Sequence, residues 1–287
     1  MFYLLYKEKN ISSFKAIKDF ANKNKIKKIG HTGTLDPLAT GLLLVATDEY
    51  TKLISYIDSK RKTYITKIKF GTQTSTYDEE GEIVNTSEYK VTFNDLEKIN
   101  QWFLKQIKQL PPIFSAKKIN GIRAYDLARK NQNVKLNEQK ITIFNSEILN
   151  FDEINQELDV KLEVSNGTYI RSLVNDVAIA FNTFAYMKEL ERISISNLSK
   201  SLLNDKNFVK IKYQQILPNM YFDSSKKEKY ELLMGKTLST NLNNGIYFAR
   251  DLLEKEENQI YGIVEITNNF VKSKKLFGNC IIKEKKC

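Results

Sequence analysis

Cysteine and histidine are scarce in this sequence. Its 287 residues include two cysteines and one histidine. Cys280 and Cys287 both lie near the C-terminus, without a histidine or another cysteine at the spacing of a metal site. A structural zinc site and a disulfide framework are therefore not expected. We expect one small core residue and one thiol at a frayed terminus.

Long apolar runs and a secretory signal are also missing. No run approaches the ~18 apolar residues that a membrane helix needs. The start, MFYLLYKEKN, lacks the basic front and long apolar middle of a signal peptide. It is more typical of an edge strand, so the sequence predicts a cytoplasmic protein.

Phosphate-binding motifs are missing as well. The segment GHTGTLDP, residues 30–37, matches neither GxGxxG nor the GK[ST] of a P-loop. No metal cluster and no serine or cysteine nucleophile motif accompanies it. We expect an enzyme with this sequence to work without a cofactor, by carboxylate chemistry.

Positive charge is abundant. The 45 lysines and arginines exceed the 34 acidic residues, which gives a net charge of +11. Such an excess indicates a polyanionic partner, most often a nucleic acid. Lysine, asparagine and isoleucine are all frequent, as compositional drift in an AT-rich genome also predicts. The charge alone leaves both explanations open.

The order of elements predicts an α+β fold, because strands and helices do not alternate strictly. The uninterrupted apolar run at 41–47 is typical of a strand buried on both faces, and 62–71 alternates like a half-buried strand. Residues 113–140 are basic and polar, like an insertion, and a domain boundary is expected near 222. Helical spacing and proline positions predict helices over 12–25, 48–59, 92–109 and 167–181.

Asp36 is the candidate catalytic carboxylate. It precedes a proline, which favours an extended backbone, and a buried strand. Gly30, Gly33 and Gly41 let a ligand or another backbone approach closely. The loop can thus present a carboxylate at the mouth of a cleft. The alternative, which these residues alone favour, is an aspartate bonded to its own turn.

His31 also has two interpretations. A lone histidine can act as a general base. It can also be a flat ring that stacks on a base or holds a gap open. Because no nucleophile motif lies beside it, we favour the packing role.

Four motifs, taken in order, resemble the TruB family of pseudouridine synthases. Together they cover about residues 6–200, which is more specific than any one motif and displaces the turn interpretation of Asp36. The motifs are GHTGTLDPLATGLLLVAT at 30–47; KTYITKIKFGTQTSTYDEEG at 62–81, a K-x-Y strand followed by G-x-x-T-x-T-x-D-x-x-G; PPIFSAKKINGIRAYDLAR at 111–129; and VSNGTYIRSLVNDV at 164–177.

The resemblance implies an isomerase that converts uridine 55 in the T loop of tRNA to pseudouridine without a cofactor. It implies a catalytic domain over 1–222, with a mixed, largely antiparallel sheet flanked by helices, and an RNA-binding thumb at 113–140. Residues 223–287 would form a reduced PUA-like domain that contacts the tRNA acceptor arm. The expected partner is tRNA; a membrane or an obligatory protein partner is not expected, and a monomer is.

The resemblance also implies roles for individual residues. Asp36 is the catalytic aspartate, and Arg171 pairs with it, which should lower its pKa and fix its orientation. Tyr64 stacks on the target base and takes part in proton removal from C5. Tyr169 and Leu190 line the pocket.

The remaining assignments concern contacts with the RNA. His31 occupies the gap that the flipped base leaves, and Gly33 gives the RNA backbone room. Basic residues on the rim are expected to hold phosphates, the alternative being an ordinary solvated face. These residues are Lys117, Lys118, Arg123 and Arg129.

The sequence departs from the family pattern in three places. The opening Lys-Pro-x-G-x-T-S reads YKEKNISS, which keeps Lys7 and Ser13. The Cys-Ser-Lys before the G-T-Y-I-R turn ends in Asn166, and Leu-Arg-Arg-Thr reads LERI at 190–193. These changes remove positive charge near the expected RNA path, so they bear on affinity rather than on the reaction.

Two other functions stay open. The guide-RNA-dependent relative, the catalytic subunit of a box H/ACA particle, shares these motifs, although the thumb at 113–140 favours the stand-alone enzyme. A chaperone that refolds tRNA is the other; the intact Asp36, Tyr64 and Arg171 argue against it as the sole activity. Attack at C1′, attack at C6 and a glycal route stay equally open.

Overall fold

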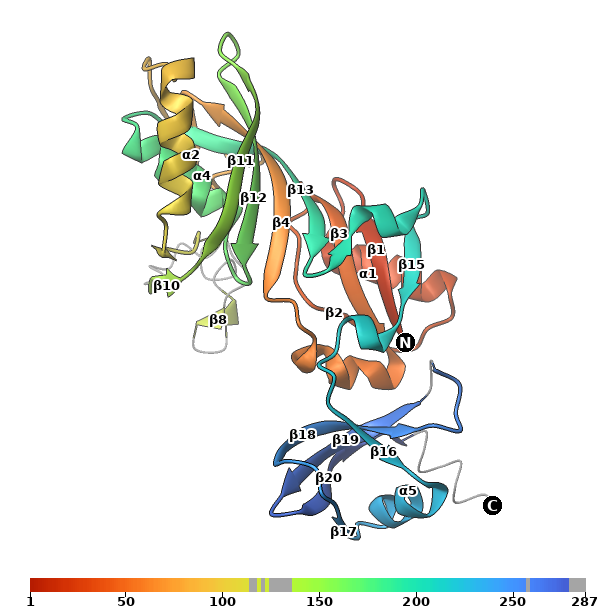
Figure 1. Ribbon diagram of the computed structural model, residues 1–287. Coiled ribbons are helices and arrows are strands. Elements are labelled where there is room, and N and C mark those ends of the chain that lie inside the picture. The colour runs from red at the N-terminus through yellow and green to blue at the C-terminus, as the bar shows by residue number, and fades with distance from the viewer. Residues whose placement is uncertain (114–117, 120–121, 124–135, 257–258, 279–287) are drawn as a thin grey trace.

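The computed structural model describes residues 1–113, 118–119, 122–123, 136–256 and 259–278 (Figure 1). The predictions for Lys117, Arg129, Cys280 and Cys287 lie outside these residues. For Lys118 and Arg123 the structure describes only the backbone of a short hairpin, β8 (Lys118–Ile119) and β9 (Ile122–Arg123).

A mixed sheet forms the body of the molecule. Neighbouring strands pair antiparallel, except that β13 runs parallel to β3. This confirms the mixed, largely antiparallel sheet. In spatial order its strands are β11 (Ile143–Asp152), β12 (Glu157–Ser165), β4 (Arg61–Phe70), β13 (Ala185–Ile195), β3 (Thr40–Thr47), β1 (Phe2–Lys7) and β15 (Phe208–Ile211), with β2 (Ile29–His31) beside β3 and β14 (Leu198–Ser199) beside β13.

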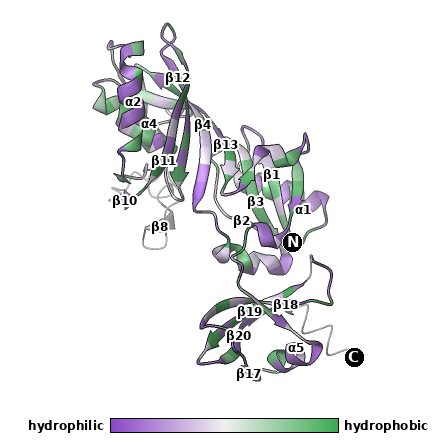
Figure 2. Ribbon diagram, viewed as in Figure 1, coloured by the Kyte–Doolittle hydropathy of each residue, from purple (hydrophilic) through white to green (hydrophobic). Residues whose placement is uncertain are grey.

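The strand predictions for 41–47 and 62–71 agree with β3 and β4. Residues 41–47 are all buried, as their uninterrupted apolar run predicts, and β4 alternates in burial. Figure 2 shows hydrophobic residues along β3 and a hydrophilic start to β4. The edge-strand prediction for the first residues is wrong, because β15 pairs with the outer side of β1.

Helices flank the sheet, as expected. Helices α2 (Leu96–Leu104) and α4 (Ile170–Ala180) cover the half formed by β11, β12, β4 and β13, and α1 (Ser13–Lys23) lies by β2. Two helix predictions need correction. The helix predicted over 48–59 is the 3₁₀ helix η1 (Asp48–Tyr56). The helix predicted over 92–109 ends at Leu104, because its last residues form β7 (Lys108–Gln109), which pairs with β10 (Gln139–Lys140).

Shorter elements complete this part of the chain. The hairpin of β5 (Thr72–Thr74) and β6 (Ile83–Thr86) lies between β4 and α2 in the sequence. Three short 3₁₀ helices are η2 (Phe93–Asp95), η3 (Lys200–Leu203) and η4 (Tyr213–Gln215).

The C-terminal part forms a separate, mainly β structure (Figure 1). It is a five-stranded sheet with helix α5 (Lys226–Leu233), consistent with a PUA-like domain. Its strands, in spatial order, are β16 (Tyr221–Ser224), β18 (Gly245–Asp251), β19 (Ile260–Thr267), β20 (Phe270–Leu276) and β17 (Leu238–Ser239).

The C-terminal sheet also shares apolar contacts with the body. Phe248 and Phe277 belong to one buried cluster with Phe2 and Leu53 of the N-terminal half. The ring centroids of Phe2 and Tyr50 lie 5.1 Å apart in this cluster. A second core lies between the main sheet and its helices and leads up to the site described next.

Candidate active site

Lys7 and Ser13, which the sequence keeps from the family's opening Lys-Pro-x-G-x-T-S pattern, hold the loop that carries Asp36. The Ser13 hydroxyl accepts a hydrogen bond from the Leu35 amide and donates one to the Leu35 carbonyl, both at 2.8 Å. The buried Lys7 ammonium donates to backbone carbonyls, including that of Pro37 at 3.1 Å. The loop is thus held immediately before and after Asp36.

Arg171 lies between two carboxylates. Its Nε is 3.1 Å from Asp36 Oδ2, and its Nη1 is 3.1 Å from Asp78 Oδ2. The same Nη1 donates to the Thr76 carbonyl at 3.1 Å. Arg171 lies in the first turn of α4, and its side chain is only 7% exposed. These contacts therefore fix the plane of its guanidinium and the position of the Asp36 carboxylate.

Burial dominates the electrostatics of Asp36. It raises the pKa of this carboxyl, the Asp78 carboxylate adds to the rise, and Arg171 acts against both. Arg171 therefore lowers the pKa of Asp36, as predicted, but its effect does not outweigh burial and the net shift is upward. The Asp36 side chain is still 38% exposed, so water reaches it.

A pocket of about 350 Å³ opens in front of this carboxylate. It is formed by the Asp36 loop, β4, β13 and the start of α4, so segments far apart in the sequence meet there. Tyr64 and Leu190 are 7% and 8% exposed. Six predicted site residues line the pocket: Gly33, Asp36, Tyr64, Tyr169, Arg171 and Leu190.

His31 is beside the pocket rather than in its lining. It ends β2, and its Nδ1 accepts a hydrogen bond from the Gly33 amide at 3.2 Å. Burial lowers the pKa of His31, which favours the neutral ring. Because Nδ1 accepts this hydrogen bond, the neutral ring carries its proton on Nε2 and has no free nitrogen to act as a base, which fits the packing role better than general-base catalysis.

Sequence reasoning missed a residue that positions Tyr169. The Gln109 side chain accepts a hydrogen bond from the Tyr169 amide at 2.6 Å and donates one to its carbonyl at 3.1 Å. Gln109 lies on β7, where a helix was predicted. Because the segment was predicted as a helix, the contact of Gln109 with the Tyr169 backbone was not expected.

Arg192 was also missed. The LERI departure predicted a loss of positive charge, yet this arginine is 1% exposed and lines the pocket. Its guanidinium donates to the Leu42 carbonyl at 2.7 Å and to the Gly33 carbonyl at 3.0 Å, and lies 3.5 Å from the Tyr64 hydroxyl. It therefore joins β13 to the loop that carries Asp36.

The glycines make room chiefly for the protein itself. Gly41 has φ +108°, and a Cβ there would overlap the backbone of Arg192. A Cβ on Gly33 would lie 2.9 Å from the Lys62 ammonium nitrogen. Another backbone does approach Gly41, as predicted, but the space beside Gly33 holds a lysine of the same chain.

The described part of the chain holds no group of three or more histidine, cysteine or acidic side chains that could bind a metal ion. Nor does any helix within those residues have the length and apolar character to cross a membrane.

Residues 21–170 match the family model described as TruB family pseudouridylate synthase (N terminal domain). The chain belongs to this family. It is 46% identical to tRNA pseudouridine synthase B of Mycoplasma mobile, over 99% of this chain and 96% of that protein. The homologue of the same name from Mycoplasmopsis pulmonis is 43% identical, over 100% and 98% of the two chains. The Aquifex aeolicus homologue is 41% identical over 68% of each chain.

Solved structures have the same fold as this TruB family member. The crystal structure of a Cbf5–Nop10–Gar1 complex aligns with a TM-score of 0.62 at 16% identity, covering 96% of this chain and 84% of the matched chain. The structure of an H/ACA RNP bound to a substrate RNA containing 2′-deoxyuridine aligns with a TM-score of 0.60 at 14% identity, again covering 96% of this chain and 84% of the matched chain. These likenesses confirm the predicted fold.

Two further residues of the site that were not predicted, Asp78 and Lys62, lie within the family motifs themselves. Asp78 is the aspartate of G-x-x-T-x-T-x-D-x-x-G, and Lys62 is the lysine of K-x-Y. Motif membership was therefore a usable signal for both. The roles of the predicted site residues remain predictions.

Proposed function

We propose that this chain isomerises uridine 55 in the T loop of tRNA to pseudouridine. The observation that carries the proposal is the ion pair of Asp36 and Arg171 in a pocket that Tyr64 also lines, in a TruB family member. Relatives named tRNA pseudouridine synthase B match the chain from end to end. The name of these relatives supplies the substrate class.

The reaction exchanges one glycosidic bond for another. The C1′–N1 bond breaks, the uracil rotates, C1′–C5 forms, the C5 proton is released and N1 ends protonated. The ionised Asp36 acts on the nucleoside by attack at C1′, by attack at C6 or by removal of a ribose proton. In each route Arg171 orients the carboxylate and stabilises its charge.

The target base must first leave its stack, which costs a few kcal/mol. Tyr64 offsets part of this cost, since stacking on an aromatic ring is worth about 1–3 kcal/mol. Tyr64 also takes part in removal of the C5 proton. Tyr169 and Leu190 complete the walls around the base, and His31 fills the gap that it leaves in the RNA.

We further propose that residues 1–222 are the catalytic domain, with a thumb at 113–140, and that the PUA-like residues 223–287 contact the acceptor arm of tRNA. The enzyme acts as a cytoplasmic monomer. Strand β16 (Tyr221–Ser224) spans the proposed boundary and belongs to the C-terminal sheet.

The test uses the purified chain alone and an unmodified tRNA transcript labelled with tritium at C5 of uridine. We expect about one tritium released per tRNA, with the pseudouridine mapped to position 55. Release without any other protein would exclude dependence on a guide particle. If tRNA bound but released no tritium, the stand-alone function would be contradicted, and a guide-dependent enzyme or a chaperone would replace it.

A further inference from the structure

A buried lysine lines the same pocket and has no place in the chemistry above. Lys62 is 5% exposed and lies on β4, two residues before Tyr64. Both side chains line the pocket that contains Asp36. The Lys62 ammonium donates to Asn166 Oδ1 at 2.6 Å.

Lys62 forms no ion pair with any carboxylate in the part of the chain that the structure describes. Its hydrogen-bond partner is the neutral amide of Asn166, and the nearby charge that acts on it is the positive Arg192. Burial lowers the pKa of Lys62 to about 8, and Arg192 acts in the same direction. A buried cation without an anion is costly, so this wall of the pocket is suited to receiving one.

Gly33 places this ammonium against the loop that carries Asp36. A Cβ at Gly33 would lie 2.9 Å from Lys62 Nζ and 3.7 Å from Arg192 Nη1. The pocket therefore has two cations on one wall, whereas its carboxylate, Asp36, is paired with Arg171. A nucleotide matches this arrangement, with its phosphate at the cations and its nucleoside at Asp36.

We propose that Lys62 is a substrate-binding residue whose ammonium contacts a backbone phosphate of the RNA nucleotide that enters the pocket. The inference rests on the proposed function and adds a contact to it. Asn166 holds the Lys62 ammonium in place through its hydrogen bond, and Arg192 lines the same wall. A phosphate oxygen accepts a hydrogen bond from an N–H group of the ammonium that does not donate to Asn166.

The main test compares Lys62→Gln with Lys67→Gln. Lys67 lies on the same strand but faces the other side of the sheet, where it pairs with Asp159 at 3.3 Å. The affinity for unmodified tRNA is measured over a range of salt concentrations. We expect Lys62→Gln to weaken binding about tenfold in dilute salt and to reduce the slope of log K against log salt by about 1. Lys67→Gln should leave both unchanged.

Two outcomes would overturn the inference. An unchanged slope with slower conversion of bound tRNA would mean that Lys62 acts on the reacting base or sugar. An unchanged slope and an unchanged rate would mean that the amine only fills space. Tritium release by the unaltered chain is measured in parallel, so loss of the proposed function would be recognised separately.

A pH series on the unaltered chain provides a second test, which does not depend on a variant that folds. A phosphate would raise the pKa of Lys62 from about 8, so binding should take up a proton and weaken about tenfold between pH 7 and pH 9. The other groups around it are Arg192, which keeps its charge, the neutral His31 and the Asp36 carboxylate. The fall should persist in Lys67→Gln and vanish in a folded Lys62→Gln. A constant affinity from pH 7 to pH 9 would contradict the phosphate contact.

Discussion

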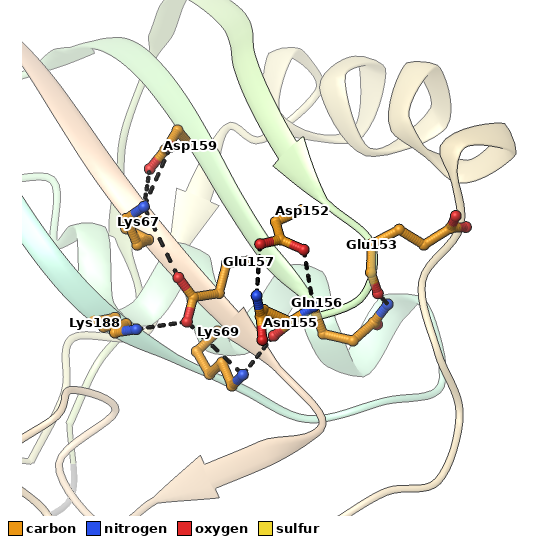
Figure 3. Close-up of polar contacts among 9 residues, drawn as sticks. All are labelled: Lys67, Lys69, Asp152, Glu153, Asn155, Gln156, Glu157, Asp159 and Lys188. Carbon is orange, nitrogen blue, oxygen red and sulfur yellow. Dashed lines mark hydrogen bonds and ion pairs between the residues drawn. The ribbon is translucent and has the colours of Figure 1, made fainter.

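Both faces of strand β4 carry charged side chains, but those on the outer face are paired and partly exposed, whereas those on the cleft face are buried. On the outer face, Lys67 and Lys69 belong to a network with Asp159, Glu157 and Lys188 (Figure 3). Glu157 lies 3.9 Å, 3.8 Å and 2.5 Å from Lys67, Lys69 and Lys188. Every lysine there has a carboxylate partner and is partly exposed.

On the cleft face, charge is buried and incompletely neutralised. Lys62 and Arg192 are buried side by side, and Arg171 is shared by two carboxylates. The outer network follows from strand register, since Asp159 faces Lys67 and Glu157 faces Lys69 across β12 and β4. The cleft charges come from distant segments and lose solvation. We therefore expect the outer charges to stabilise the sheet and the cleft charges to serve the proposed substrate and reaction.

The largest effect should come from Arg171→Gln. Without the guanidinium, Asp36 loses its orientation and Asp78 becomes a buried carboxylate without its cation. We expect single-turnover conversion to fall about 100-fold or more and the free energy of unfolding to fall by about 3 kcal/mol. Rates are measured with saturating tRNA.

Arg250→Gln is the matched control for this change. Arg250 makes two hydrogen bonds to the Asp223 carboxylate, at 2.6 and 2.8 Å, in the C-terminal sheet. Replacing Arg250 should leave the rate at which bound tRNA is converted unchanged. Equal rate losses in the two variants would remove the distinction between the cleft and the rest of the molecule.

The pH dependence of the rate is the next largest effect. The proposed reaction needs ionised Asp36, and burial raises the pKa of that carboxyl. Single-turnover conversion should therefore fall about tenfold per pH unit on the acid side, beginning above the ordinary aspartate value of about 4. Asp78→Asn should move this limb to lower pH, because the Asp78 carboxylate contributes to the rise. A limb at or below the ordinary value would show that Arg171 outweighs burial.

A glycine comparison tests how tightly the cleft is built. Gly41→Ala combines a positive φ with an overlap against the Arg192 backbone, whereas Gly235→Ala, at φ +79°, meets nothing within 4 Å. We expect unfolding free energy to drop by about 3 kcal/mol or more for the first and by about 1 kcal/mol for the second. Urea unfolding measures both. Equal losses would mean that the close approach of β3 and β13 is not needed.

The smallest effect should come from the outer face. Glu157→Gln removes the carboxylate that three lysines share, and should reduce stability by no more than about 1 kcal/mol. The hydrogen bond from Lys188 lowers the pKa of Glu157, so its contribution is present at neutral pH and lost as pH falls through that lowered value. Turnover should not change. A loss of turnover would show that the outer face takes part in function.

Much of this architecture could be predicted because the motifs are local. The burial of β3 and the alternation of β4 each lie within one quoted segment. The pairing of Arg171 with Asp36 joins two distant segments, so only the resemblance to the family pointed to it. The position of β1 could not be predicted, since the strand that covers its edge follows some 200 residues later. The net pKa of Asp36 depends on burial by the whole fold. The cluster of Lys62, Gly33 and Arg192 depends on three segments meeting.

The most direct test of the account is single-turnover tritium release by Asp36→Asn beside the unaltered chain, with tRNA binding measured for both. Asparagine preserves the shape of the side chain but cannot supply a carboxylate. We predict that Asp36→Asn binds tRNA and releases no tritium, while the unaltered chain releases about one per tRNA. Release by Asp36→Asn at the unaltered rate would contradict the assignment of the chemistry to this residue.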